Sequence, residues 1–258
     1  GFRSFAKHLM TYLMERADQS SRLHLTTLIP EIMDYNIHRP RDEIREIWLI
    51  MCQGLSNVVV RYTSKDELLG VVASLKALSV SLLSHRLISI TDIMNVFMDI
   101  NSRSEKLFVR DAIVQSVGNI MVSLPASIDE MATNHIIQIL AMAVKVGPVV
   151  SSQAHQLMEE KEQLDKFLVV QHAFANLAAL VHQNFDIVVS SRSYRECIAC
   201  IRIFLQQGEE VITIQAIELI DYIVRGLLER TAKNSDSTIE STEELTSLWI
   251  PLLHMLSV

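Results

Sequence analysis

The stretch Leu107-Phe-Val-Arg-Asp-Ala-Ile-Val-Gln-Ser-Val-Gly-Asn-Ile-Met-Val-Ser-Leu-Pro125 indicates the fold of this chain. Its apolar residues recur every three or four positions, which places them in one stripe along an amphipathic helix. Gly118 lies in the middle of the stretch, where the lack of a side chain allows a neighbouring helix to approach closely. Pro125 has no backbone N–H and is expected to end the helix. The rest of the chain carries variations on this pattern.

Length and composition favour a helical domain. The chain has 258 residues, of which 49% are hydrophobic, so it is long enough to bury a sizeable core. It contains only 7 glycines and 5 prolines, which leaves little material for tight hairpin turns. No shift in composition divides the chain, so we expect residues 1–258 to form a single all-α domain. Its first residues lack the apolar core of a signal peptide, and its last residues stop inside an apolar pattern. We therefore expect an intracellular fragment of a longer protein.

Apolar periodicity predicts helices along nearly the whole chain. The predicted ranges are 3–18, 22–36, 42–60, 65–84, about 91–100, 103–124, 128–146, 149–160, 162–183, 194–206, 209–230 and 242–257. Five of these starts have Ser followed three residues later by Glu, which is the spacing of a capping box. These pairs are Ser64/Glu67, Ser102/Glu105, Ser127/Glu130, Ser193/Glu196 and Ser241/Glu244. Thr91 is the expected cap of the helix to residue 100, and Pro30 should kink the second helix or shorten its first turn.

The pattern Val-Arg-x-Ala-x-x-x-x-Val-Gly-x-Ile at residues 109–120 resembles the second helix of a HEAT repeat. Aligning Val109 with Val169, Ile113 with Ala216 and Ile44 with Val109 repeats the pattern along the chain. Successive copies are separated by irregular offsets of roughly 40–65 residues, near the length of HEAT and armadillo units. The resemblance implies a right-handed α-solenoid of about five or six stacked antiparallel helix pairs. Its concave surface would be lined by the helices at 103–124, 162–183 and 209–230.

Motifs that carry chemistry are scarce. Cys197-Ile-Ala-Cys200 is the only CxxC, and it lacks both a second ligand pair for zinc and a preceding strand, so packing in the core is the better interpretation. The nine histidines show no metal-binding spacing, and glycine is too scarce for a phosphate-binding loop. We therefore expect no enzyme activity, no cofactor and no metal. An enzyme of an unrecognised all-α type is the alternative.

The charge balance bears on the partners. A net charge of −7 and a pI near 5.7 argue against a broad surface for nucleic acid, although an RNA-binding helical-repeat module is an alternative. No apolar run of about 18 residues indicates a membrane span. The resemblance implies a protein–protein interaction scaffold or adaptor subunit of a larger intracellular complex, cytoplasmic or nuclear, that binds other subunits or peptide segments. A fragment of a karyopherin-type nuclear transport receptor is the more specific alternative.

Small basic clusters and polar positions on the predicted inner helices are the candidate contacts for a partner. Arg39, Arg41 and Arg45 surround one loop, and two further arginines surround another. The predicted partner-binding residues are Arg39, Arg41, Arg45, Arg110, Gln171, His182, Arg192 and Arg195.

Overall fold

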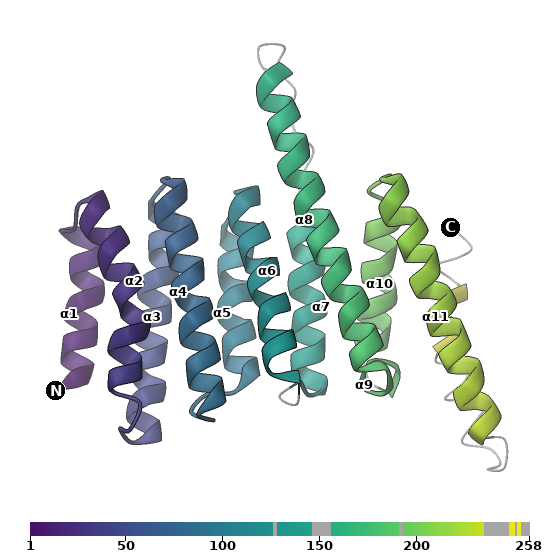
Figure 1. The fold of residues 1–258 in the computed structure, drawn as a ribbon, viewed down its shortest axis with the longest axis horizontal. Helices are drawn as coiled ribbons and strands as arrows, with labels where there is room; N and C mark the ends of the chain where they lie inside the picture. Colours follow the sequence, from purple (N-terminus) through teal and green to yellow (C-terminus); the bar gives the residue numbers. More distant parts are fainter. Residues whose placement is uncertain (126–127, 146–155, 191–192, 235–247, 251, 254–258) are drawn as a thin grey trace.

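The computed structural model of this protein describes residues 1–125, 128–145, 156–190, 193–234, 248–250 and 252–253. These residues fold into α-helices joined mostly by short connections, which confirms the predicted all-α class (Figure 1). The helices are α1 (Phe2–Glu15), α2 (Gln19–Tyr35), α3 (Arg41–Arg61), α4 (Lys65–Ser84), α5 (Ile90–Arg103), α6 (Leu107–Ser123), α7 (Glu130–Val144), α8 (Gln156–Gln183), α9 (Phe185–Ser190), α10 (Ser193–Leu205) and α11 (Glu210–Asn234).

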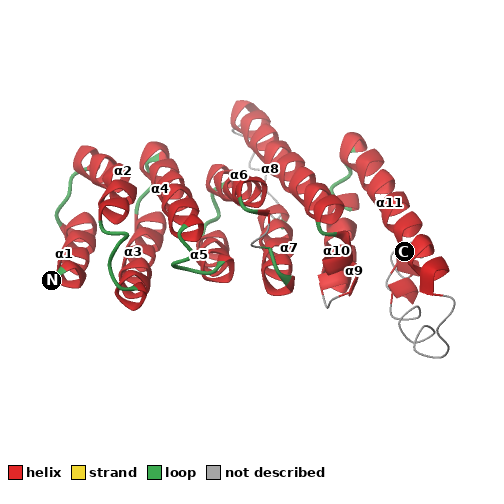
Figure 2. Ribbon diagram, turned by 60° about the horizontal axis from the view of Figure 1, so that its bottom comes forward, coloured by secondary structure: helices red, strands yellow, loops and turns green. Residues whose placement is uncertain are grey.

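The helices lie in two rows. Helices α1, α3, α5, α7 and α10 pack side by side in the first row, and α2, α4, α6, α8 and α11 pack in the second. Figure 2 shows the same two rows after a turn of the molecule. The chain passes back and forth between the rows, so most of the closest helix pairs are two places apart in sequence, such as α1 and α3, α2 and α4, and α6 and α8. The short helix α9, which the sequence did not predict, contacts α7, α8 and α10.

Hydrogen bonds between neighbours in a row join residues at a nearly constant distance in sequence. Between α2 and α4, the Arg22 guanidinium donates to Glu67, and the Ser74 hydroxyl donates to the Thr26 carbonyl, over 45 and 48 residues. Between α3 and α5, the Ser56 hydroxyl donates to Asp99 over 43 residues. A constant offset along two helices means that they run parallel, because in an antiparallel pair the offset would change steadily. Helices in one row therefore repeat every 43 to 48 residues in this part of the chain.

The offset is less regular further along the chain. The Asn101 amide of α5 donates to the Ile139 carbonyl of α7 over only 38 residues, whereas later contacts span more. His172 of α8 contacts Asp111 of α6 over 61 residues, and Cys200 of α10 lies against the Ile137 carbonyl of α7 over 63 residues. The increase coincides with the 28-residue helix α8 and with the connection that precedes it. The irregular offsets of the sequence alignment therefore have a structural counterpart.

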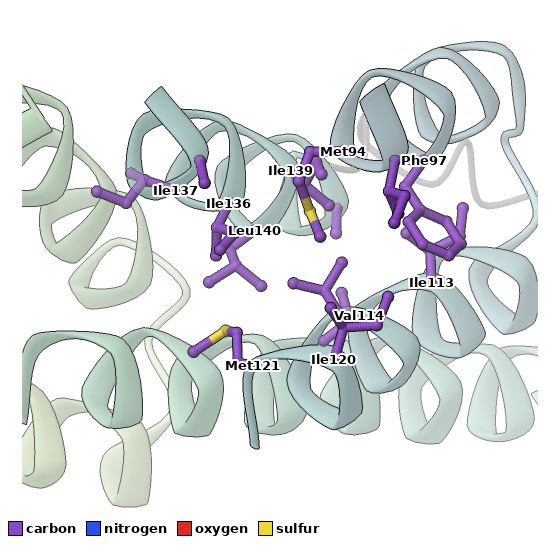
Figure 3. Close-up of a cluster of buried hydrophobic side chains, with 14 of the residues drawn as sticks. Met94, Phe97, Ile113, Val114, Ile120, Met121, Ile136, Ile137, Ile139 and Leu140 are labelled. Carbon is purple, nitrogen blue, oxygen red and sulfur yellow. The ribbon is translucent and has the colours of Figure 1, made fainter. Parts of the chain in front are cut away.

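The core fills the seam between the two rows. Figure 3 shows side chains from α5, α6 and α7 that meet in this seam, among them Phe97, Val114, Ile120, Ile136 and Leu140. All five are buried. Each fully buried aliphatic or aromatic side chain contributes roughly 1.5–3 kcal/mol relative to an exposed one. The apolar stripe that the sequence places on residues 107–125 is thus the part of α6 that faces the first row.

The predicted close approach at Gly118 is confirmed. A Cβ atom at Gly118 would lie 2.3 Å from the Oδ1 atom of Asn176 on α8, which leaves no room for a side chain. The Asn176 amide donates to the Val114 carbonyl at 2.7 Å, so this contact joins α6 to α8. Glycine at this position therefore permits a hydrogen bond between two neighbouring helices.

The capping predictions were mostly wrong. Among the described helix starts, the full capping box is made by Ser89 and Asp92 at α5, two residues earlier than the predicted cap Thr91. Ser64 does stand at the start of α4, but its side chain makes no capping bond and accepts from Gln19 instead. At Ser64, a hydrogen bond from a residue far away in sequence thus replaces the capping bond that the spacing predicts.

Two other predicted caps are themselves helical residues, and Ser193 is the first residue of its helix. Ser102 belongs to the last turn of α5, where its hydroxyl donates to the Asp99 carbonyl, and α6 begins only after Lys106. Ser193 is a buried residue of α10, and its hydroxyl lies 3.4 Å from the Glu130 carbonyl of α7. Ser127 and Ser241 lie outside the described residues.

Several helix boundaries also differ. The predicted helix at 22–36 starts earlier, because Asp18 caps α2 by accepting from the Ser21 amide, and α2 continues through Pro30. The separate helices predicted at 149–160 and 162–183 correspond, where described, to the single helix α8. Most of the predicted helix at 242–257 lies outside the described residues.

One of the three alignments of the central stretch was wrong. Pairing residue 109 with 169, or 113 with 216, aligns α6 with α8 and α11, and all three belong to the second row. Pairing Ile44 with Val109 aligns α3 with α6, which belong to different rows. Both rows carry similar apolar stripes because both bury one face in the same seam, so sequence periodicity does not separate them.

Two helical segments, Lys65–Ser84 and Glu162–Gln183, are long and apolar enough to cross a membrane by length and composition. Packing also explains their composition, since each lies in the second row between two neighbours and against the first row. Leu75 of α4 and Leu177 of α8, for example, are completely buried. Burial in the core therefore accounts for the apolar composition of these two segments, which is only weak evidence for a membrane span.

Candidate functional site

The first basic cluster does not form an open anion site. The Arg39 guanidinium donates to Asn36 Oδ1 at 2.8 Å and to Glu43 Oε1 at 3.1 Å. Arg41 donates to the Leu87 carbonyl at 3.3 Å, and Arg45 lies 3.6 Å from Asp92. Each of the three arginines therefore contacts a different group of the protein itself, and their charges do not converge.

Arg110 has a structural position between α6 and α7. Its guanidinium donates to the carbonyls of Ser104, Met142 and Lys145 at 2.9, 3.3 and 3.2 Å. The last two acceptors belong to the C-terminal end of α7, where carbonyl groups lack partners within the helix. Burial lowers the pKa of Arg110, while nearby Glu105 acts in the opposite direction. Arg110 thus connects two helices rather than offering a free charge to a partner.

The remaining predicted residues are spread over both rows. Gln171 and His182 are exposed on α8, and the His182 ring packs edge-on against Tyr222 of α11 with 4.2 Å between ring centroids. Arg195 is exposed on α10, in the first row. Arg192 lies outside the described residues. The predicted set does not assemble into one site.

The cysteines lie in the core, as the CxxC interpretation predicts. Cys52, Cys197 and Cys200 are all free and buried. Burial raises the pKa of Cys197 to about 12 and raises the pKa of Cys52 and Cys200 well above the ordinary value. A thiol held in its protonated form is a poor nucleophile and a poor metal ligand. Among the described residues, no group of three or more His, Cys, Asp or Glu is placed to hold a metal ion.

A groove crosses the second row over α4, α6 and α8. Its cavity volume is about 380 Å³. Its lining combines apolar side chains with charged and amide side chains. The lining residues are Lys65, Leu69, Val72, Ala73, Lys76, Phe108, Asp111, Ala112, Gln115, Ser116, Asn119, Asp165 and Leu168. We call this feature the α4–α6–α8 groove. It lies on the outward side of α6.

Asp111 has a partner on each of its carboxylate oxygens in the α4–α6–α8 groove. Its Oδ1 atom lies 2.7 Å from Nδ1 of His172, and its Oδ2 atom accepts from the Gln115 amide at 2.7 Å. The Asn176 amide anchors α8 to α6 one turn further along. The carboxylate therefore has partners on both oxygen atoms and fixes the spacing of α6 and α8.

Sequence reasoning missed this groove, although a signal was present. Asp111, Gln115 and Asn119 follow one another at four-residue spacing on the side of α6 away from its apolar stripe. Such a row of polar residues marks the solvent side of a helix. Periodicity alone does not show which helices lie beside α6. Helices α4 and α8 form the walls of the groove and contribute Lys65, Lys76 and Asp165 to its lining.

Two further grooves lie on the first row. One, of about 400 Å³, lies between α1 and α3, and the other, of about 450 Å³, between α3 and α5. They share Gln53 and Asn57 of α3. In the second of them, Asp99 already accepts from Ser56 and forms an ion pair with Arg103. Grooves thus occur on the outer faces of both rows.

Comparisons with protein families, with curated proteins and with solved structures give no significant match to this chain. The functional interpretation therefore depends on the residues and their arrangement.

Proposed function

We propose that this chain is a non-catalytic protein–protein interaction scaffold, a HEAT/armadillo-like α-solenoid that serves as an adaptor subunit of a larger intracellular complex. The observation that carries the proposal is that contacts between two neighbours in a row keep a regular sequence offset, 45 to 48 residues between α2 and α4 and 61 to 62 residues between α6 and α8. Repeated helix pairs that bury one continuous core leave long outer faces uncovered, and such faces are suited to binding other proteins.

The second row is the proposed binding face. It contains α6, α8 and α11, which correspond to the helices that the sequence analysis places on the concave surface. The α4–α6–α8 groove lies on this row. Its mixture of apolar and polar side chains is typical of surfaces that bind proteins or peptides.

The buried thiols weigh against one type of catalysis. The three cysteines are buried with raised pKa values, so they are unsuited to act as nucleophiles. The histidine that contacts a carboxylate, His172, makes a contact that joins two helices. These observations favour a scaffold over a thiol-dependent enzyme.

The test is affinity purification of the tagged protein from cell extract at moderate salt, followed by mass spectrometry. A variant of the second row carries Gln115→Arg, Asn119→Arg and Gln171→Arg. The matched control carries Gln53→Arg, Asn57→Arg and Asn95→Arg on the first row. We expect stoichiometric partners with wild-type protein and with the control, and their loss from the second-row variant. Loss with the control alone would contradict the choice of face, and no partner with any of the three proteins would contradict the scaffold function.

A further inference from the structure

The α4–α6–α8 groove contains charged groups that the protein itself does not neutralise. Of its two carboxylates, Asp111 is held by His172 and Gln115. The two lysines, Lys65 and Lys76, take part in no ion pair with any residue that the structure describes. The groove therefore presents two positive charges outside any ion pair on its α4 wall, while its carboxylates, Asp111 and Asp165, lie on α6 and α8.

The apolar part of the groove is partly open. Phe108 of α6 and Leu168 of α8 line it and are half-buried, and the Phe108 ring lies 5.5 Å from Nζ of Lys65. An apolar side chain that covers these two residues would remove hydrophobic surface from water, at about 25 cal/mol per Å² of apolar area buried. The same contact would bring neighbouring groups of a partner close to the lysine ammonium groups.

Size and spacing define the shape of the occupant. About 380 Å³ is near the lower end of the roughly 300–1,000 Å³ usual for ligand sites, so the groove accepts one or two side chains rather than a whole helix. Lys65 and Lys76 are eleven positions apart on α4, which corresponds to about 16 Å along the helix axis. In an extended peptide, residues about five positions apart span this distance.

We propose that the α4–α6–α8 groove binds a short, extended, acidic segment of a partner protein. One bulky apolar side chain contacts Phe108 and Leu168, and two carboxylates about five positions apart contact Lys65 and Lys76 through charge-assisted hydrogen bonds. Asp165 on α8 repels acidic residues from the opposite wall, which fixes the side on which the carboxylates lie. This inference rests on the proposed scaffold function and specifies the chemistry of the partner.

The test is selection from a random dodecapeptide library displayed on phage. Three baits are used: wild-type protein, the double variant Lys65→Glu/Lys76→Glu, and the matched control Lys7→Glu/Arg16→Glu. The control makes the same change in net charge at two exposed positions in and just after α1. Circular dichroism establishes that all three baits have the same helix content.

Wild-type protein and control are expected to enrich peptides with two acidic residues four to six positions apart around a bulky apolar residue. The double variant should lose these peptides and select basic ones. A selected peptide, labelled with fluorescein, should bind the double variant at least tenfold more weakly in anisotropy measurements, and salt should weaken its binding to wild-type protein. Failure of wild-type protein to enrich acidic peptides, or equal binding to the double variant, would overturn the proposal.

The outcome is separable from that of the proposed function. If partner proteins co-purify with wild-type protein and stay bound to Lys65→Glu/Lys76→Glu, the scaffold function stands and the acidic-segment assignment is wrong. If acidic peptides bind through the two lysines but no protein co-purifies from extract, the groove assignment stands and the scaffold function is contradicted.

Discussion

The first and second halves of the chain use the same two-row arrangement but join their helices by different contacts. From α1 to α6, neighbours in a row are linked by polar contacts over 43 to 48 residues, such as Arg22 to Glu67 and Ser56 to Asp99. From α6 to α11, polar contacts between neighbours span 61 to 63 residues, as between Asp111 and His172, and rings add contacts such as Tyr222 against His182. Both halves thus bury the same apolar seam, while the sequence distance between neighbouring helices and the contacts that join them differ.

The largest expected loss of stability follows from a substitution in the second half of the chain. Phe204 is fully buried in α10 and packs edge-on against Phe174 of α8, with ring centroids 5.2 Å apart. Phe204→Ala should reduce the free energy of unfolding by about 3–5 kcal/mol, of which about 0.5–1.5 kcal/mol reflects the ring pair. Hydrogen exchange measured by mass spectrometry should show faster exchange in α8, α10 and α11 and little change in α1–α3, because repeat units contact mainly their neighbours. Equal acceleration along the whole chain would mean that the array unfolds as one unit.

The next effect tests the polar links of the first half. Glu67 is 4% exposed and its ion pair with Arg22 is almost completely buried. Glu67→Ala leaves the Arg22 charge without its partner, so we expect a loss of about 3 kcal/mol in chemical denaturation. The matched control in the second half is Asp221→Ala, which removes an exposed ion pair with Arg225 and should cost at most about 0.5 kcal/mol. Similar losses for the two variants would contradict the distinction between buried and exposed links.

A pair of glycine substitutions compares the close approaches of the two halves. A Cβ at Gly226 would lie 2.3 Å from the Phe185 ring, while a Cβ at Gly54 would lie 2.4 Å from the sulfur of Met10. The sulfur of Met10 can move aside, but the Cβ of Met10 would lie 2.9 Å from the same position and moves only with the backbone. The Phe185 atoms instead lie at the far end of a side chain that can turn. We expect Gly54→Ala to destabilise by about 1–3 kcal/mol through overpacking, and Gly226→Ala to destabilise less. Thermal unfolding of both variants measures the difference, and a larger loss at Gly226 would contradict the argument.

The smallest effect concerns the buried thiols. Burial raises the pKa of Cys197 to about 12 from 9.0, so the folded state keeps the proton longer than the unfolded state. This contribution to stability is fully present below pH 9 and is lost as the pH rises from 9 towards 12. At pH 8 a thiol reagent such as dithionitrobenzoate should label almost no cysteine in the native protein and all three after denaturation. Rapid labelling of the native protein would show that the core around α10 opens readily.

The sequence predicted the helices better than their ends. Periodicity located α4 at Lys65–Ser84 as expected, because its apolar residues follow one face for five turns. The predicted caps failed where a tertiary contact was stronger than a local one. Ser64 accepts from Gln19 and Glu67 pairs with Arg22, so neither residue was free to form the capping box that their spacing predicts.

The α4–α6–α8 groove was not predicted from the sequence. Arg39, Arg41, Arg45 and Arg110 drew attention because positive charges often bind partners, but all four contact groups of the protein itself. A sequence lists charges without stating which of them already have a partner. Lys65 and Lys76 looked ordinary in sequence, and only the positions of α6 and α8 place them on one wall of a groove, outside any ion pair with the described residues.

The sequence by itself determined the all-α class, the position of most helices and the need for glycine at position 118. These properties follow from local physics, namely the period of apolar residues and the small size of glycine. The tertiary structure decided which helices share a row, where the repeat lengthens, and which charges are left without partners. Those properties depend on contacts across 38 to 63 residues, whose geometry is set only when the two rows close on their common core.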